Sequence, residues 1–282
     1  VVGAQGAALD YAALRDAAAQ LTDTLRMLGV AVLATRLDNG PAWIVADLAA
    51  LQAGVVHVPL PAFFTPAQVA HGLQAAGVDA LLTAPSGDAS AAATDLPLVV
   101  AGERLMLGLR AAQAVPLPEG TAKITFTSGT TGRPKGVCLS AAAMLAVAEG
   151  VAQALAPLAI ERHLCALPLA VLLENVAGVY APLIGGAACV ALPCAQAGLT
   201  GSTQFDPARL QHAVDTQRAH SAIVLPQMLR LWAGWRAGAA AGGRLPPMPP
   251  TPLKFVAVGG AGVGAAVLHQ ARAVGLPAYE GY

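Results

Sequence analysis

The chain has 282 residues, enough for one large domain or two smaller ones with a sizeable core. Apolar residues make up 56% of it and charged residues 11%, and 16 basic side chains balance 16 acidic ones. No basic surface is therefore available to neutralise a phosphate backbone, which argues against nucleic acid as a partner. Four cysteines without Cys-x-x-Cys or zinc-type spacing are interpreted as reduced packing residues of a cytoplasmic protein.

Candidate helices and strands alternate along the first part of the chain, each marked by its own start and stop signals. Proline at the first helical position and a glycine after the last turn bracket a helix from Pro41 to Ala53. Thr65-Pro66 opens another helix, and residues 84–96 are expected to form a loop. In chain order we expect a helix over 11–28, a strand over 30–35, the helix from Pro41, a strand over 55–58, a helix over 65–77 and a strand over 80–83.

The same pattern continues to the end of the chain. Asp206-Pro207 opens a helix before a strand over 221–225, and residues 238–252 are expected to form a loop. A strand over 253–258, a glycine turn and a helix over 263–274 follow. The alternation predicts an α/β fold with layered, mostly parallel sheets flanked by helices.

The most membrane-like stretch covers residues 176–192, but Pro182 and Gly185-Gly186 interrupt it, and it is short for a spanning helix. We therefore expect no transmembrane segment, while peripheral association through apolar surface stays open.

One segment concentrates the chemistry of a phosphate site. A β-like run at 124–126 leads into a stretch in which hydroxyls, glycines and cations crowd together. Glycines let the backbone N–H groups approach a ligand, hydroxyls donate to oxygens, and lysine adds a point charge. The Walker pattern is excluded because Lys135 is followed by Gly136 and not by Ser or Thr. The predicted phosphate-binding residues are Thr127, Ser128, Gly129, Thr130, Thr131, Gly132 and Lys135.

The run from Thr127 to Gly136 resembles the signature loop of the adenylate-forming superfamily, which contains acyl-CoA synthetases, peptide-synthetase adenylation domains and luciferases. Residues 37–43 and 53–60 are similar to the early core segments of its fatty-acid-activating members. The resemblance implies an incomplete N-terminal AMP-binding domain over residues 1–282, with two α/β subregions at about 1–120 and 121–282 and the C-terminal domain absent.

The glycine turn near the C-terminus supports two interpretations. After a strand and before a helix, Gly260-x-Gly262-x-x-Ala265 with Glu280 about 20 residues on fits a dinucleotide fingerprint. This match is weak because it would begin a Rossmann half at the end of the chain. In the resemblance, the residues that line adenine are Gly259, Gly260, Ala261, Glu280, Gly281 and Tyr282.

An apolar segment over residues 167–175 resembles the wall of the acid pocket, which usually carries a histidine where this chain has Val171. Val171, Leu172 and Asn175 are the predicted pocket residues, and an ordinary buried helix start is the alternative. None of the six histidines has metal-ligand spacing, so we predict no metal ligands, and we interpret the histidines as surface or satisfied core residues.

The resemblance implies that ATP activates a carboxylic acid, a fatty acid above all, as an acyl-adenylate, which CoA then converts to a thioester. Mg²⁺ is the expected metal, but its usual glutamate, the ribose aspartate and the C-terminal lysine are absent from these residues. We thus expect no catalytic residues here and little activity from this chain alone. Loading of an acyl carrier protein, an amino-acid adenylation domain and an inactive truncated fragment with a regulatory or scaffolding role are the alternatives.

Overall fold

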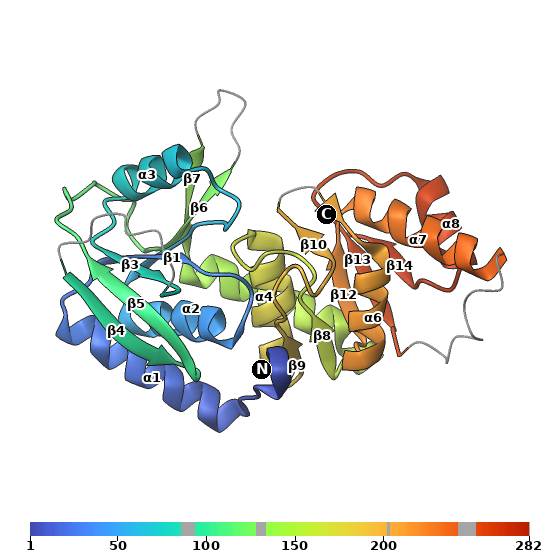
Figure 1. Ribbon diagram of the computed structural model, residues 1–282, viewed down its shortest axis with the longest axis horizontal. Coiled ribbons are helices and arrows are strands. Elements are labelled where there is room, and N and C mark those ends of the chain that lie inside the picture. Colours follow the sequence, from blue (N-terminus) through green and yellow to red (C-terminus); the bar gives the residue numbers. More distant parts are fainter. Residues whose placement is uncertain (86–93, 128–133, 202–203, 242–251, 282) are drawn as a thin grey trace. The chain divides into compact units, whose positions relative to one another are not determined.

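The computed structural model describes residues 1–85, 94–127, 134–201, 204–241 and 252–281 (Figure 1). The chain divides into two compact units, Gln5–Ala146 with Val1 and Val147–Tyr282 with Val2–Ala4. The expected division at about residue 120 falls inside the first unit, because the strand that follows it continues the first sheet.

A seven-stranded sheet with the order β4-β5-β3-β1-β2-β6-β7 forms the centre of the first unit. The four inner strands β3, β1, β2 and β6 are parallel, and β5 and β7 pair antiparallel with their neighbours. The strands are β1 (Val32–Arg36), β2 (Val56–Pro59), β3 (Ala80–Thr83), β4 (Thr94–Val100), β5 (Glu103–Leu109), β6 (Thr121–Thr127) and β7 (Lys135–Ser140).

Helices α1 (Tyr11–Met27), α2 (Pro41–Ala53) and α3 (Pro66–Ala75) flank this sheet. The chain moves from β1 to β2 in one direction and from β2 back past β1 to β3 in the other. Right-handed crossovers therefore place α2 and α3 on opposite faces, with α1 beside α2 (Figure 1). As the sequence predicts, Gly54 ends α2 and Thr65 caps α3; Gly54 has the left-handed conformation, and Thr65 forms a capping box with Gln68.

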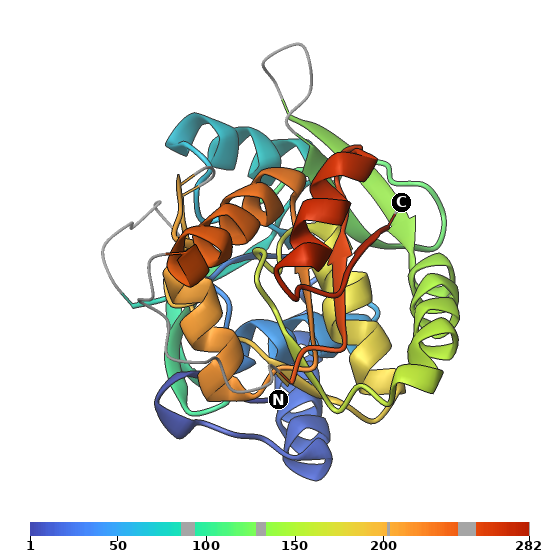
Figure 2. The same ribbon diagram turned by 90° about the vertical axis from the view of Figure 1, so that its right-hand side faces the viewer.

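The second unit contains a five-stranded parallel sheet with the order β14-β13-β12-β8-β9. Figure 2 shows this sheet and its helices from the side of the unit. Its strands are β8 (Arg162–Leu164), β9 (Ala188–Val190), β12 (Ser221–Val224), β13 (Phe255–Val258) and β14 (Ala278–Glu280), and a short antiparallel pair joins β10 (Leu199–Thr200) to β11 (Gln204–Phe205).

Helices α6 (Pro207–Gln217), α7 (Pro226–Ala241) and α8 (Ala265–Ala273) connect successive strands of this sheet and cover one face. A π-helix (Glu174–Tyr180) and α5 (Ala181–Ile184) form the connection from β8 to β9. The core lies between the sheet and α6–α8, around the fully buried Trp232, whose indole N–H donates to Gln211 at 2.9 Å. The α/β class with mostly parallel sheets is confirmed.

Three local expectations are wrong. Residues 94–96, expected to end a loop, belong to β4, which pairs with β5. Residues 238–241 continue α7, because alanine-rich sequence favours the helix over a loop. Cys138 is exposed, whereas Cys165 and Cys189 are buried.

Residues 176–192 do not form a continuous helix, because they are divided among the π-helix, α5 and β9. Among the described residues, one other helical stretch, Ala141–Leu158, is long and apolar enough to cross a membrane by length and composition, with a mean hydropathy of 1.5. It consists of α4 (Ala141–Leu155) and the 3-10 turn Ala156–Leu158. A single stretch of this kind is weak support for a membrane span.

Candidate functional site

The ends of the predicted phosphate segment lie on one hairpin of the first unit. Thr127 is the last residue of β6 and Lys135 the first residue of β7, and the two are direct cross-strand partners. Both side chains are exposed, and the Thr127 hydroxyl lies 3.5 Å from the Lys135 carbonyl oxygen. The hairpin therefore presents a hydroxyl and an ammonium group at the carboxyl end of a parallel strand, where α/β sheets bind ligands. The residues predicted between them, Ser128, Gly129, Thr130, Thr131 and Gly132, lie outside the described residues.

Helix α3 supports the far end of this segment. The Nε2–H of His71 donates to the Pro134 carbonyl at 3.0 Å, and the His71 ring packs edge-on against Phe126 of β6. Gly136 of β7 lies against Phe126 and Ile124, and a Cβ atom at this glycine would come within 2.9 Å of Ile124. Close strand packing thus explains this glycine of the signature, and His71 fixes the backbone that leads into Lys135.

A buried ionic cluster lies beneath the same strand. Lys123 of β6 is 2% exposed, and its Nζ lies 2.7 Å from Oδ1 of Asp47 on α2. The same Oδ1 lies 2.6 Å from Nδ1 of His57 on β2, whose Nε2 lies 2.9 Å from the Thr35 hydroxyl. Lys123 also lies over the Trp43 ring, 5.8 Å from its centroid. These contacts join α2, β1 and β2 to the strand that ends at Thr127.

The members of this cluster shift one another's pKa values. Burial alone would raise the pKa of Asp47, but the ammonium of Lys123 and the hydrogen bond from His57 outweigh it and hold the pKa far below its ordinary value. Burial lowers the pKa of His57 from 6.5, although Asp47 opposes this, so the imidazole is neutral at pH 7. A neutral His57 donates from Nδ1 to Asp47 and accepts from Thr35 at Nε2, which gives every member a partner.

The predicted adenine-lining residues gather at the carboxyl edge of the second sheet. Gly259, Gly260 and Ala261 follow β13, Glu280 is the last residue of the adjacent parallel strand β14, and Gly281 follows it. The Gly281 N–H donates to the Val258 carbonyl at 2.8 Å, which ties the two loops together. Gly260 has φ +84°, a conformation that favours glycine. Tyr282 lies outside the described residues.

Glu280 points back into the glycine turn and accepts a hydrogen bond from the Val263 N–H at 3.0 Å. In a dinucleotide site this carboxylate would have to bind a ribose. Here it holds the turn between β13 and α8, which supports the adenine-loop interpretation over the dinucleotide one.

The predicted acyl-pocket segment adjoins the glycine turn within the same unit. A Cβ atom at Gly259 would lie 3.1 Å from Cδ2 of Leu173, the residue that follows Leu172. Val171 and Leu172 are half-buried, whereas Asn175 is only 2% exposed. The apolar segment therefore reaches the loop expected to line adenine, and Asn175 belongs to the buried structure behind it.

A buried pair that the sequence did not reveal anchors this segment. Oε2 of Glu174 accepts from the Leu167 N–H at 2.9 Å, and its Oε1 lies 2.9 Å from Nε2 of His163 on β8. Ser221 of β12 contacts the other ring nitrogen of His163 at 2.9 Å. Burial raises the pKa of Glu174, an effect that His163 opposes. Glu174 thus closes the loop 167–173 on itself and fixes the base of the acyl segment.

His163, Cys165 and Glu174 form the one group of possible metal ligands in the described part of the chain. Their potential ligand atoms lie within 4.8 Å of one another, but they bond to protein: Glu174 to Leu167, and the Cys165 thiol to the Gly178 carbonyl at 3.7 Å. Mg²⁺ prefers oxygen ligands, so this imidazole–thiol–carboxylate set does not fit it.

Comparison with known proteins gives the family context of these sites. The sequence profile of the family described as AMP-binding enzyme matches residues 1–282. A feruloyl-CoA synthase from Amycolatopsis sp is 32% identical over 251 residues, which cover 82% of this chain and 47% of that protein. Phenyloxazoline synthase MbtB from Mycobacterium sp. (strain MCS) is 34% identical over 155 residues, 53% of this chain and 13% of that one.

The fold has solved counterparts. O-succinylbenzoate coenzyme A synthetase (MenE) from Bacillus subtilis, in complex with AMP, matches 97% of this chain and 67% of its own, with a TM-score of 0.69 and 21% sequence identity. At this identity the similarity is one of fold. The chain spans about half the length of the feruloyl-CoA synthases that it matches.

Proposed function

The chain belongs to the AMP-binding enzyme family, and on that premise we propose that it supplies the nucleotide- and acid-binding part of an enzyme that activates a carboxylic acid with ATP. The carboxylate attacks the α-phosphate of ATP, an acyl-adenylate forms, and pyrophosphate leaves. A thiol then displaces AMP from the acyl group and yields a thioester. The observation that carries the proposal is the complete signature from Thr127 to Gly136 in the sequence, whose first residue ends β6 and whose Lys135 is exposed and pairs with Thr127 across the strands.

Charge builds up on the β- and γ-phosphates as pyrophosphate leaves, so the enzyme has to offer hydrogen-bond donors and positive charge there. Thr127, at the end of β6, provides a hydroxyl donor, and Lys135, its partner on β7, provides a positive charge. The His71–Pro134 hydrogen bond restrains the backbone on the lysine side. These residues hold the phosphates in position, and no proton transfer is assigned to them.

In the second unit, the turn Gly259–Ala261 and Gly281 are suited to the flat face of adenine because glycines let the backbone approach it closely. Val171, Leu172 and Leu173 give an apolar wall for the acid, which supports a fatty or aromatic carboxylic acid. The 32% identity to a feruloyl-CoA synthase supports CoA as the thiol. Similarity over 155 residues to phenyloxazoline synthase MbtB supports the second candidate, transfer to a carrier protein.

The proposal is tested with the protein purified in its natural length. Acid-dependent exchange of labelled pyrophosphate into ATP is measured with fatty acids of several lengths, ferulate and amino acids. Exchange with one acid class supports the proposal and names the substrate. CoA and a carrier protein are then compared as acceptors, and absence of exchange with every acid would contradict the proposal.

A further inference from the structure

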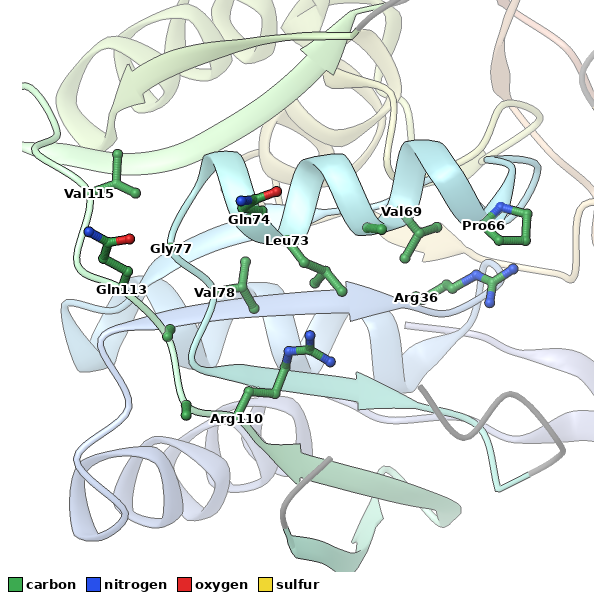
Figure 3. A pocket seen from close by; sticks show the side chains of 13 residues that line it. Arg36, Pro66, Val69, Leu73, Gln74, Gly77, Val78, Arg110, Gln113 and Val115 are labelled. Atoms are coloured by element: carbon green, nitrogen blue, oxygen red, sulfur yellow. The ribbon is translucent and has the colours of Figure 1, made fainter. Parts of the chain in front are cut away.

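Two features of the described residues take no direct part in the proposed chemistry. One is a cavity of about 680 Å³ in the first unit, and Figure 3 shows the apolar side chains Val69 and Leu73 that α3 contributes to its lining. An apolar lining of this kind is compatible with many ligands and selects none of them. The other feature is the group of His163, Cys165 and Glu174 in the second unit, whose side chains are all metal ligands in other proteins.

These three side chains meet on one face of the second sheet. Leu164 of β8 packs into the core against α6–α8, so the residues on either side of it, His163 and Cys165, project from the opposite face. Glu174 reaches them from the π-helix that begins the connection from β8 to β9. Nε2 of His163 lies 2.9 Å from Oε1 of Glu174, and the ligand atoms of all three residues lie within 4.8 Å of one another. All three residues are buried, so an ion among them would be shielded from water.

The protein holds the outer atoms of two of these groups. Ser221 of β12 lies 2.9 Å from Nδ1 of His163, and the Leu167 N–H donates to Oε2 of Glu174 at 2.9 Å. Nε2 and Oε1 are thus turned inward, toward each other and within reach of the Cys165 thiol. Hydrogen bonds at the outer atoms orient metal-binding histidines and carboxylates in the same way.

The π-helix keeps a side chain away from the inner atoms. A Cβ atom at Gly178 would lie 2.8 Å from Nε2 of His163, so any larger residue there would fill the space beside the ligand atoms. The Gly178 carbonyl accepts the Cys165 thiol at 3.7 Å, and a thiol is only a weak donor, so a metal can replace this contact. π-Helices are rare and occur frequently at functional sites. The location of Glu174 on such a segment is therefore a second observation that favours a binding site.

The three donors select the ion. Thiolate, imidazole and carboxylate are the ligands of Zn²⁺, whereas Mg²⁺ and Ca²⁺ take oxygen ligands. A tetrahedral zinc ion at its usual bond lengths separates its ligand atoms by roughly 3.3–3.6 Å. The 2.9 Å between Nε2 of His163 and Oε1 of Glu174 and the 4.8 Å limit of the whole group bracket this spacing. Small side-chain shifts are thus enough to admit the ion.

We propose that His163, Cys165 and Glu174 bind one Zn²⁺ ion, which joins β8 to the π-helix. The ion displaces the thiol proton to solvent, and the imidazole proton lies on Nδ1, where the Ser221 hydroxyl accepts it. The ion also neutralises the fully buried carboxylate of Glu174, which closes the loop 167–173. The bound ion therefore fixes this loop. The site stands on its own geometry and does not depend on the proposed function.

The experiment is a zinc titration of the natural-length protein after metal removal, in competition with a chelating dye and with Co²⁺ absorption as a second readout. We expect binding that excess Mg²⁺ does not displace, and a thiolate-to-cobalt charge-transfer band that Cys165→Ala removes. Glu174→Gln keeps an oxygen for the Leu167 N–H, so it should fold, and circular dichroism checks this. Because the loss of even an outer partner costs about 10- to 100-fold in metal affinity, Glu174→Gln and Cys165→Ala should each weaken zinc binding about 100-fold or more.

Two further variants separate a metal site from a structural cluster. Ser221→Ala keeps all three ligands and should weaken zinc binding about tenfold, because it removes the outer partner of His163. Cys138→Ser removes an exposed thiol of the first unit and should leave binding unchanged. The proposal is overturned if the metal-depleted protein binds no zinc, if the cobalt complex lacks the thiolate band, or if Glu174→Gln and Cys165→Ala bind zinc as tightly as the unchanged protein.

Discussion

Replacing Lys123 by methionine tests how the first unit holds the strand that carries the phosphate segment. Methionine keeps most of the length of the side chain and removes its charge, so Asp47 stays buried and keeps its contact with His57. Removing one partner of a buried ion pair costs about 3–5 kcal/mol. We expect Lys123→Met to lower the free energy of unfolding by about this amount at pH 8. Asp47→Asn, which leaves the lysine charge buried, should cost a similar amount.

The double variant Asp47→Asn with Lys123→Met removes both charges and keeps an oxygen for the His57 N–H. It should cost less than either single variant, because no uncompensated charge is left inside. Urea unfolding followed by circular dichroism gives the free energies, and hydrogen exchange of residues 121–127 assigns them to β6. A loss below about 1 kcal/mol in Lys123→Met, or a double variant whose cost equals the sum of the two, would refute the reasoning.

The contacts of His71, Gly260 and His57 lead to further predictions. His71→Ala should raise the dissociation constant for ATP several-fold in calorimetry because Pro134 loses its donor, and His71→Gln should restore much of the affinity. Gly260→Ala should cost about 1–3 kcal/mol in urea unfolding because of its φ of +84°, whereas Gly262→Ala, with nothing within 4 Å of its Cβ position, should be nearly neutral. His57 has a folded pKa below 6.5, so the unfolded chain binds the extra proton and stability should fall as the pH drops below 6.5, by at most about 1.4 kcal/mol per pH unit. Because Lys123 is one cause of that lowering, Lys123→Met should raise the His57 pKa and cost less at pH 5.5 than at pH 8.

Local signals of the sequence predict the parallel core of both units well. Pro41, Gly54 and Thr65 act in the structure as helix start, stop and cap, because these effects depend on neighbouring backbone alone. The hairpin β4–β5 was missed because β4 contains Pro97, which sequence rules treat as a strand breaker. β4 is an edge strand that is held by its pairing with β5, and the sequence of β4 alone does not show that this pairing forms.

The ends of the phosphate segment could be located from the signature, but the groups that support it could not. Asp47, His57 and Lys123 lie on three different elements, α2, β2 and β6, and the one available signal was a charged or ionisable side chain in each of these apolar elements. Their meeting depends on the order β1-β2-β6 in the sheet. The same holds for Glu174 and His163, which a π-helix and a parallel strand bring together.

The central claim is that this chain contributes to ATP-dependent activation of a carboxylic acid. The most direct test is acid-dependent ATP–pyrophosphate exchange by the natural-length protein, compared with its Lys135→Met variant and with Lys254→Met as a control for loss of a lysine outside the phosphate segment. We predict exchange with a fatty or aromatic acid, a fall of about tenfold or more in Lys135→Met because one charge-assisted contact to phosphate is lost, and no change in Lys254→Met. Exchange that does not depend on an acid, or that Lys135→Met leaves unchanged, would contradict the account.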